Sequence, residues 1–413
     1  MLFIMPPSFY ILNEDASPPL QFEPFFQFDN VDFLHLKRGM SLNAIPITDC
    51  YGISSYTEDI EVSRIIAKFL KQRDPQCKVI LGGYHTLSNN LYDDCFDYVV
   101  IGFGEEWVKK FVVGEYPEAR ILYGSYRLID WGIESYEFYQ KYNPHFHRGM
   151  NNAYSIRTTY GCFWNCSFCL NRFKKVIYKS WDNISFQLHY LAEKGIKSIR
   201  VIDEIFTFHP QFELIVELLG RLNFEWTAQD RISSLTKEKV SFLKQNNCRL
   251  IQTGVESLNN DILIKLQKEI TVDEIKAKVK MCQDLGLSLS PYFMLGLPFD
   301  TIDTIQQTRD LALQLFDPGL LRPDIYIPLP GSLIGDNPEK FGVRFLTKEF
   351  RYFSPFCFQN IHGRLVSIPG NIDDIDKWEQ ILRNTLYNLS PPLIKNILKN
   401  PITTWYDDLM FTP

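Results

Sequence analysis

The sequence predicts an α/β protein: a doubly wound, Rossmann-like parallel sheet domain, then a partial (β/α)6 barrel and a mainly helical C-terminal tail. Two observations predict this fold class. Strand-like and helix-like segments alternate in two separate blocks, and three cysteines lie within eight residues directly after the first strand of the second block. We expect a first domain over residues 1–113, a connector over 114–150, the barrel over 151–340 and a C-terminal extension over 341–413.

The first block alternates short apolar runs with one clear helix pattern. We expect strands at Leu2–Met5, Val31–Leu36, Cys50–Ile53, Lys78–Leu81 and Tyr98–Ile101. Apolar residues recur at helical spacing over Asp59–Lys71, which predicts a helix there. The segment Asn13–Phe28 carries three prolines and four phenylalanines, so we expect an ordered loop rather than a helix. Strands that alternate with helices indicate a mostly parallel sheet that is covered on both faces.

The second block repeats the alternation more regularly. We expect strands at Tyr154–Thr158, Ser198–Ile202, Glu225–Ala228, Arg249–Thr253, Ser288–Leu295 and Asp324–Pro328. We expect helices at Ile184–Lys194, Gln211–Arg221, Lys237–Gln245, Val272–Leu285 and Thr301–Leu315. Six strands separated by helices are typical of a partial barrel, in which the carboxyl ends of the strands form one functional rim. The tail has one further helix pattern, at Ile372–Tyr387.

Composition limits the function classes. The 43 basic residues face 49 acidic ones, a net charge of −6 that argues against a nucleic-acid partner. No apolar stretch approaches the roughly 20 residues that a membrane span needs. The apolar N-terminus lacks a preceding basic residue, since the first is Lys37, so it is interpreted as a buried strand and the protein is expected in the cytoplasm. The nine cysteines follow no spacing that suggests disulfides.

The cysteine loop carries the clearest chemistry. Cys162, Cys166 and Cys169 follow the first barrel strand in the spacing C-x3-C-x2-C. Three clustered thiolates can bind three irons of a cubane iron–sulfur cluster, which leaves the fourth iron open to another ligand. Three basic residues follow the loop and either favour the thiolates or form a solvated turn; they are Arg172, Lys174 and Lys175. The alternative is a structural zinc site, whose fourth ligand would come from His145, His147 or a remote residue.

These cysteines, with Phe168 before the last of them, resemble the motif of the radical S-adenosylmethionine (SAM) superfamily. The resemblance implies a 4Fe-4S cluster on Cys162, Cys166 and Cys169, with SAM on its fourth iron. It also implies reductive cleavage of SAM, a 5′-deoxyadenosyl radical that abstracts hydrogen from an unactivated carbon, and an external electron donor such as flavodoxin or ferredoxin.

The resemblance continues around the barrel and implies a set of SAM-binding residues. The matching positions are Phe168, Asp203, Glu204, Arg231, Glu256 and Leu295. Asp203 and Glu204 match acidic residues near the SAM ammonium group, although an acidic helix cap is an equally simple interpretation. Arg231 suits the SAM carboxylate as a two-pronged donor, or pairs with Asp230.

Glycine- and hydroxyl-bearing turns in the first block resemble the N-terminal domain of cobalamin-binding radical SAM enzymes. The residues implied in cobalamin binding are Ser54, Ser55, Gly82, Gly83, His85, Gly104 and Glu105. Glycine lets backbone approach a large flat cofactor at the carboxyl edge of a parallel sheet. No D-x-H-x-x-G motif is present, so a histidine ligand to cobalt is not expected. The run from Pro7 to Gly52 is short, which predicts an abbreviated sheet that either binds cobalamin or only caps the barrel.

The leading hypothesis is a radical SAM enzyme acting on a small molecule or peptide, with cobalamin-dependent methylation of an unactivated carbon if cobalamin binds. Without cobalamin, the same barrel would support oxidation, cyclisation or rearrangement. A methylthiotransferase is disfavoured because Cys50, Cys77 and Cys95 do not follow strand ends as that family's cysteines do. The alternative of another class is a zinc-stabilised, non-enzymatic binding protein. The sequence identifies no substrate.

Overall fold

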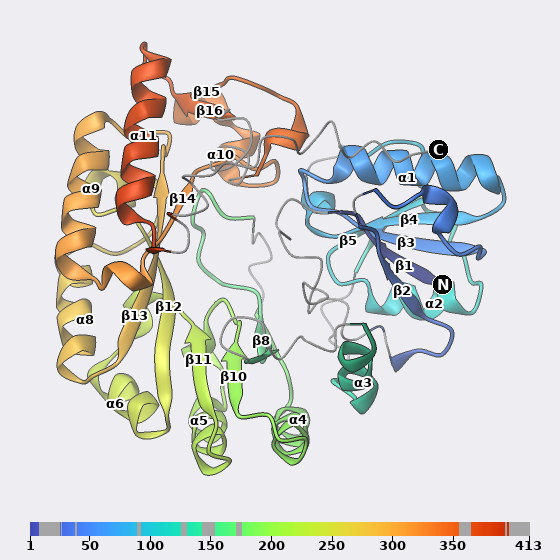
Figure 1. The fold of residues 1–413 in the computed structure, drawn as a ribbon, viewed down its shortest axis with the longest axis horizontal. Helices are drawn as coiled ribbons and strands as arrows, with labels where there is room; N and C mark the ends of the chain where they lie inside the picture. Colours follow the sequence, from blue (N-terminus) through green and yellow to red (C-terminus); the bar gives the residue numbers. More distant parts are fainter. Residues whose placement is uncertain are drawn as a thin grey trace.

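Two parallel sheets, each flanked by helices, lie side by side in the computed structural model of the chain (Figure 1). The structure describes residues 1–7, 25, 27–37, 39–88, 92–124, 130–142, 153–170, 176–354, 365–392 and 395. Most of the loop expected at Asn13–Phe28 lies outside these residues, as do the basic residues after the cysteine loop and both candidate zinc histidines.

The first sheet has six parallel strands in the order β2-β1-β3-β4-β5-β6. They are β1 (Leu2–Met5), β2 (Asp32–His35), β3 (Cys50–Ser54), β4 (Lys78–Gly82), β5 (Tyr98–Ile101) and β6 (Ile121–Tyr123). Helices α1 (Ile60–Arg73) and α2 (Glu105–Val112) cover opposite faces (Figure 1). The strand order reverses direction at β1, which is the switch point where open α/β sheets bind ligands.

This topology confirms the doubly wound sheet and corrects two details. The sheet is not abbreviated, since it contains six strands among the described residues. Strand β6 and helix α3 (Ile133–Tyr142) lie in the segment that was expected to be a connector, and β6 pairs with β5. Strand β6 was not predicted, because a strand of three residues is too short to show an alternation of apolar and polar residues. The domain boundaries themselves stay a prediction.

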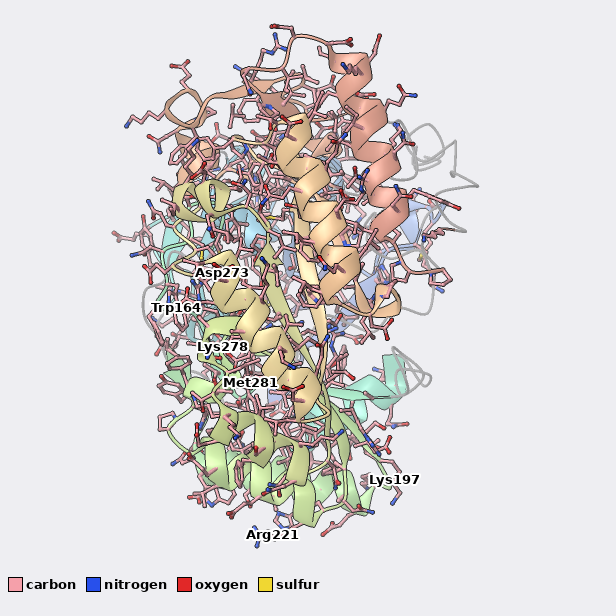
Figure 2. The ribbon with its side chains drawn as sticks, turned by 90° about the vertical axis from the view of Figure 1, so that its left-hand side faces the viewer. Trp164, Lys197, Arg221, Asp273, Lys278 and Met281 are labelled. Carbon is pink, nitrogen blue, oxygen red and sulfur yellow. The ribbon has the colours of Figure 1, made fainter. Side chains whose placement is uncertain are left out.

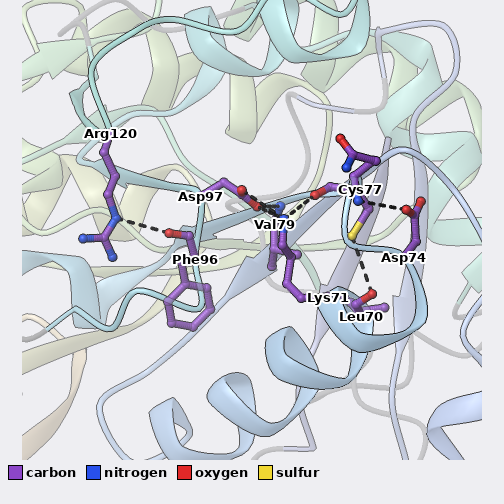
Figure 3. A network of polar contacts seen from close by, with 9 residues as sticks. Leu70, Lys71, Asp74, Cys77, Val79, Phe96, Asp97 and Arg120 are labelled. Carbon is purple, nitrogen blue, oxygen red and sulfur yellow. Dashed lines mark hydrogen bonds and ion pairs between the residues drawn. The ribbon is translucent and has the colours of Figure 1, made fainter.

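Polar contacts lock the amino-terminal edge of this sheet (Figure 3). Lys71, near the end of α1, forms an ion pair of 3.1 Å with Asp97 and donates to the Cys77 carbonyl oxygen at 2.8 Å. Asp97 in turn accepts a hydrogen bond of 2.8 Å from the Val79 amide, and Arg120 Nε donates to the Phe96 carbonyl oxygen. These partners satisfy one another within the protein and stabilise this edge of the sheet.

The second sheet also has six parallel strands, in the order β14-β13-β12-β11-β10-β7. They are β7 (Tyr154–Ile156), β10 (Ser198–Val201), β11 (Glu225–Gln229), β12 (Cys248–Glu256), β13 (Ser288–Leu295) and β14 (Arg322–Ile325). The outer helices are α4 (Trp181–Glu193), α5 (Phe212–Arg221), α6 (Lys237–Gln245), α7 (Asn260–Lys265), α8 (Val272–Asp284) and α9 (Ile302–Leu315). Each predicted barrel strand and helix overlaps one of these elements, which confirms the partial (β/α)6 barrel.

The barrel has a clear polarity in Figure 2. Lys197, directly before β10, and Arg221, the last residue of α5, lie low in this view, at the amino-terminal end of the strands. Trp164 of the cysteine loop lies higher, beyond the carboxyl ends. Asp273, Lys278 and Met281 lie along α8, and Lys278 fastens this helix by donating to the Leu235 carbonyl oxygen. The functional rim is therefore remote from the solvent-exposed base.

The C-terminal segment covers the open edge of the barrel. It contains α10 (Leu333–Asp336), the antiparallel pair β15 (Val343–Phe345) and β16 (Ser367–Pro369), and α11 (Ile375–Leu389). Helix α11 packs against α9 and β14, where Trp378, Leu382 and Leu386 join the main hydrophobic core (Figure 1). None of the described helices is both long and apolar enough to span a membrane. The cytoplasmic location stays a prediction.

Candidate functional site

A cavity of ≈ 380 Å³ lies where the carboxyl edges of the two sheets face each other. The first sheet contributes turns that follow β3, β4 and β5, and the barrel contributes the start of the cysteine loop. The polar and glycine lining among the described residues is Gly52, Ser54, Gly82, Gly83, Gly102, Gly104, Glu105, Arg157, Gly161, Cys169 and Glu204. The rest of the lining is mainly apolar and aromatic, including Phe3, Phe25, Val108 and Phe111. An apolar cavity with few polar groups is typical of a cofactor or small-molecule site.

The turn after β4 explains why two glycines lie together. Gly83 has φ +90°, and a Cβ there would lie 2.6 Å from both the backbone nitrogen and the carbonyl oxygen of Ser55. Only glycine tolerates that conformation and that approach. At Gly82, by contrast, the nearest atom to an added Cβ is the Ile53 carbonyl oxygen at 4.0 Å, so this glycine leaves open space beside the cavity.

The structure divides the predicted cobalamin residues into two groups. Ser54, Gly82, Gly83, Gly104 and Glu105 line the cavity.

Ser55 and His85 are not among the residues that line it, and their role in cobalamin binding stays a prediction. The Ser55 hydroxyl donates to the Tyr56 carbonyl oxygen at 2.9 Å. The His85 ring is fully buried, lies 3.5 Å from the Thr57 hydroxyl and packs edge-on against Phe350. These two side chains hold the turns in place, and they point into the protein because both turns need internal hydrogen bonds.

The cysteine loop is anchored by backbone hydrogen bonds to distant elements. A short antiparallel pair, β8 (Thr159–Tyr160) and β9 (Ile177–Tyr178), closes its base. The Ser167 amide donates to the Leu266 carbonyl oxygen at 3.0 Å, and the Ser167 carbonyl oxygen accepts from the Ile334 amide at 3.0 Å. Ser167, which lies between Cys166 and Cys169, is thus tied to the end of α7 and to α10.

The three loop cysteines have intermediate exposure. Burial and the neighbouring Cys166 raise the pKa of Cys162, whereas the nearby Arg231 guanidinium lowers it. Arg231 Nη1 also donates to Cys166 Sγ at 3.5 Å. The Arg231 guanidinium opposes the raised pKa of Cys162, and thiolates are the forms that bind iron. The donor set and its charge therefore fit a cubane cluster.

A mononuclear metal site is a separate question. Within the part of the chain that the structure describes, no three His, Cys, Asp or Glu side chains converge to hold a single metal ion. Cluster ligands are spaced more widely than the ligands of one ion, because each cysteine binds a different iron. The two histidines considered as further zinc ligands lie outside the described residues.

Arg231 is held next to the cysteine loop by three contacts. It is 7% exposed, its guanidinium lies 4.6 Å from the Trp164 ring centroid, and its Nε donates to the Ser233 hydroxyl at 2.9 Å. Its Nη2 is buried and has no hydrogen-bond partner among the described residues. The side chain does not pair with Asp230, whose carboxylate instead accepts from the Thr207 amide and the Ser234 hydroxyl.

The two acidic residues after β10 have different environments. Asp203 is fully buried and accepts hydrogen bonds from the amide and the hydroxyl of Thr158, so it ties the ends of β7 and β10 together. Its carboxylate faces these protein donors rather than the cavity, and its contact with SAM stays a prediction.

Glu204 does line the cavity, and one oxygen lies 3.7 Å from Arg157 Nη1. Its other oxygen is buried without a partner among the described residues. Burial raises the pKa of Glu204, although Arg157 opposes the shift.

Glu256 is part of a buried ion pair that the sequence did not reveal. Its carboxylate accepts from Lys268 Nζ at 2.7 Å, and both side chains are almost fully buried. The Lys268 ammonium also lies 5.7 Å from the Phe168 ring centroid, which links the pair to the cysteine loop. Glu256 has φ +70°, and a Cβ on Gly254 would lie 2.1 Å from its Oε1. Glycine two residues before Glu256 therefore leaves room for the Glu256 carboxylate to fold back over the backbone of Gly254.

Leu295, the last predicted SAM residue, ends β13 and is buried in the core. The loop after it is held by Asp300, whose carboxylate accepts from the Gly296 and Leu297 amides at 3.1 and 2.8 Å.

Sequence reasoning missed Arg157 and Lys268. Arg157 directly follows the first barrel strand, and this position at the functional rim could have marked it as a site residue. No sequence feature near Lys268 indicates its ion pair with Glu256.

The cysteines of the first domain lie on two faces of its sheet. Cys50 packs with Ile80 and Phe111 on the α2 face, whereas Cys77 and Cys95 belong to the cluster on the α1 face. Burial raises the pKa of Cys50 to about 11 and also raises the pKa of Cys77 and Cys95. Such thiols are neutral and point apart, which gives no support to a second cluster.

Comparison with known proteins finds a matching family model, similar proteins and a similar fold. Residues 156–312 match the model of the radical SAM superfamily. The chain is 27% identical over 321 residues to a protein named uncharacterized methyltransferase PH0819 from Pyrococcus horikoshii, covering 69% of this chain and 68% of that protein. It is 20% identical over 407 residues to hopanoid C-3 methylase from Methylococcus capsulatus, covering 89% and 76% respectively.

A solved structure extends the similarity to both sheets. The radical SAM methyltransferase TsrM from Kitasatospora setae, solved with cobalamin and a [4Fe-4S] cluster bound, superposes with a TM-score of 0.68 at 14% identity. The superposition covers 98% of this chain and 91% of that one. At this identity the likeness shows the fold, namely a parallel sheet domain joined to a partial barrel.

Proposed function

Because residues 156–312 are a radical SAM domain, we propose that this enzyme methylates an unactivated carbon of a small molecule or peptide with the help of cobalamin. The observation that carries the proposal is the cavity. It brings Cys169 of the cysteine loop to one side and the glycine turns of the first sheet to the other. Cobalamin held by the glycine turns would supply the methyl group to a substrate that lies beside Cys169 in the same cavity.

The cysteine loop would hold the cluster on Cys162, Cys166 and Cys169, and SAM would bind beside it. When bound, cluster and SAM together supply the radical that abstracts hydrogen from the substrate. The Arg231 guanidinium, with its partnerless Nη2, would donate to the SAM carboxylate. Phe168 and Leu295 would contribute apolar contacts, while the Lys268–Glu256 pair would hold Phe168 in position.

The glycine turns would hold cobalamin. When bound, cobalamin supplies the methyl group. Gly82 and Gly104 leave room for a flat ring system, since an added Cβ meets no atom within 3.4 Å at either position. Gly83 and Ser55 keep the turn rigid, so the backbone is ordered before the ligand arrives.

The substrate would share the remaining space of an apolar cavity, so we expect a compact, mainly apolar molecule or side chain. One structure of TsrM was solved with a tryptophan substrate, which is a molecule of this kind. Flavodoxin or ferredoxin would supply the electron. Methylation is favoured over cobalamin-independent oxidation, cyclisation or rearrangement because the glycine-lined half of the cavity would otherwise have no occupant.

The Cys166→Ala variant tests the cluster assignment. We expect anaerobic reconstitution with iron and sulfide to give the wild-type protein about four irons, a broad visible absorption and reductive SAM cleavage. The variant should lose the absorption and all 5′-deoxyadenosine formation.

Cys282→Ala is the matched control, because Cys282 is buried on α8 away from the loop and should leave both signals intact. Retained SAM cleavage in Cys166→Ala would refute the ligand set. Bound zinc without iron in the wild-type protein would favour the non-enzymatic alternative.

A further inference from the structure

Glu105 has an unusual position for a carboxylic acid. It is the first residue of α2, is only 5% exposed and lines the cavity between the two sheets. Its Oε2 atom is buried without a hydrogen-bond partner, and no lysine or arginine among the described residues pairs with it. A buried polar atom without a partner is costly, so its retention in a binding cavity points to a partner supplied by a ligand.

We propose that Glu105 is a neutral hydrogen-bond donor to the molecule that fills this cavity, and that this molecule presents a carbonyl-type acceptor to it. The inference rests on the proposed function for the identity of that molecule. Cobalamin fits the chemistry because its periphery carries amide groups, whose carbonyl oxygens accept hydrogen bonds.

The surroundings of Glu105 favour the neutral acid. Its pKa is raised to about 7, chiefly by burial and to a smaller extent by the adjacent Glu106 carboxylate, against the opposing effect of a backbone hydrogen bond at Glu105. The partial positive charge at the start of a helix would favour the anion, but it does not outweigh the loss of water.

The charged groups around it are few. On the same helix, Glu106, Lys109 and Lys110 are exposed, and the two lysine ammonium groups lie over the rings of Phe28 and Trp107. Across the cavity lie Arg157 and Glu204, which form an ion pair with each other, and the Met1 ammonium donates to the Asn30 carbonyl oxygen.

The protonation state decides what Glu105 can do for a ligand. A neutral carboxylic acid has one O–H to donate, whereas a carboxylate only accepts. An amide carbonyl facing the carboxylate would meet a second acceptor, which is repulsive. Ligand binding should therefore weaken as the pH rises through about 7. This pH dependence should disappear in a variant whose side chain at position 105 donates a hydrogen bond at every pH.

Equilibrium dialysis of the full-length protein against methylcobalamin, in the dark, tests this without any turnover. Between about pH 6 and about pH 8.5 the wild-type affinity should fall by up to about 30-fold, since the neutral fraction falls by that factor. Glu105→Gln keeps an N–H donor of the same length, so its affinity should stay nearly constant over this range. Glu105→Met has no donor and should bind weakly at both pH values.

Glu106→Gln is the matched control, because it removes the neighbouring exposed charge and leaves the cavity intact. Its affinity should still fall as the pH rises, with the midpoint moved slightly lower because the Glu106 charge no longer raises the pKa of Glu105. Equal, pH-independent affinity in the wild-type, Glu105→Gln and Glu105→Met proteins would overturn the role of Glu105 while leaving cobalamin binding intact. Absence of methylcobalamin binding in the wild-type protein at both pH values would overturn the cobalamin part of the proposed function, and this inference with it.

A second measurement needs no ligand. With a folded-state pKa of about 7 and the lower pKa of an exposed glutamate when unfolded, the folded protein holds a proton that the unfolded chain releases. The free energy of unfolding of the wild-type protein, relative to Glu105→Gln, should therefore fall as the pH rises from about 4.5 to about 7 and then level off. A constant difference across this range would show that Glu105 is ionised in the cavity and would contradict its role as a donor.

Discussion

Buried polar side chains of the barrel rim differ in whether the protein itself satisfies them. Asp203 and Asp230 accept hydrogen bonds from neighbouring strand ends, so their chemistry is structural. Arg231 and Glu204, in contrast, each keep one buried atom without a partner among the described residues. Both lie next to the cysteine loop or the cavity. At the residue scale, this difference separates side chains whose polar atoms are satisfied within the protein from side chains that keep a buried polar atom without a protein partner among the described residues.

The Lys268–Glu256 pair gives a residue-scale prediction. Lys268→Met should lower the free energy of unfolding by about 3–5 kcal/mol, because it leaves the Glu256 carboxylate buried and unpaired. The double variant Lys268→Met/Glu256→Gln should regain part of that loss, since no buried charge remains. Urea denaturation of the two single variants and the double variant measures the coupling. Additive single effects would show that the two side chains do not interact.

At the scale of the element, the turn after β4 combines rigidity with open space. Gly83 lies against the Ser55 backbone, whereas Gly82 lies beside the cavity. The amino-terminal edge of the same sheet has the opposite character, since Lys71 and Asp97 occupy it with a protein-internal ion pair. One edge of the sheet thus stabilises the fold, and the other borders the cavity, where open sheets of parallel strands commonly place ligands.

Two neighbouring substitutions separate these roles. Gly83→Ala should destabilise the protein by about 1–3 kcal/mol, because φ is +90° and the new Cβ would collide with the Ser55 backbone. Gly82→Ala should leave the melting temperature nearly unchanged, yet weaken methylcobalamin binding by placing a methyl group beside the cavity. Thermal unfolding and equilibrium dialysis on both variants provide the comparison. Equal binding by Gly82→Ala and the wild-type protein would exclude this turn from the cofactor site.

At the scale of the whole molecule, the C-terminal helix completes a barrel that its own six strands leave open. Helix α11 covers β14 and α9, and Leu382 lies against Gly296 at the end of β13. A Cβ on Gly296 would come within 3.4 Å of Leu382 Cδ1, so the tail reaches the loop that carries Leu297. The tail therefore covers the edge strand β14 and also contributes side chains to the hydrophobic core of the barrel.

Trp378→Ala tests this role of the tail. Trp378 is 1% exposed in the main core, so its loss should lower the free energy of unfolding by about 3–5 kcal/mol. Asn384→Ala, on the exposed side of α11, should change it by less than about 0.5 kcal/mol. Calorimetry of both variants is the measurement. If Trp378→Ala melts like the wild-type protein, the barrel is stable without this cover.

Much of the fold was predictable because strands and helices leave local patterns. The barrel strand at Ser288–Leu295 was predicted with the bounds that the structure shows, since an apolar run between turn residues has few other solutions. The three-residue strand β6 was missed for the opposite reason. The cysteine loop was recognisable because its chemistry depends on spacing within one short segment.

What the sequence by itself determined is therefore local: the order of strands and helices, the cysteine spacing, and the glycines that end the strands of the first sheet. Only the tertiary structure decided which polar groups meet. Thr158 bonds to Asp203 across 45 residues, and Arg231 reaches Cys166 across 65. Such partners are set by which strand ends lie next to each other at the rim, and sequence spacing does not reveal the order of strands in the sheet.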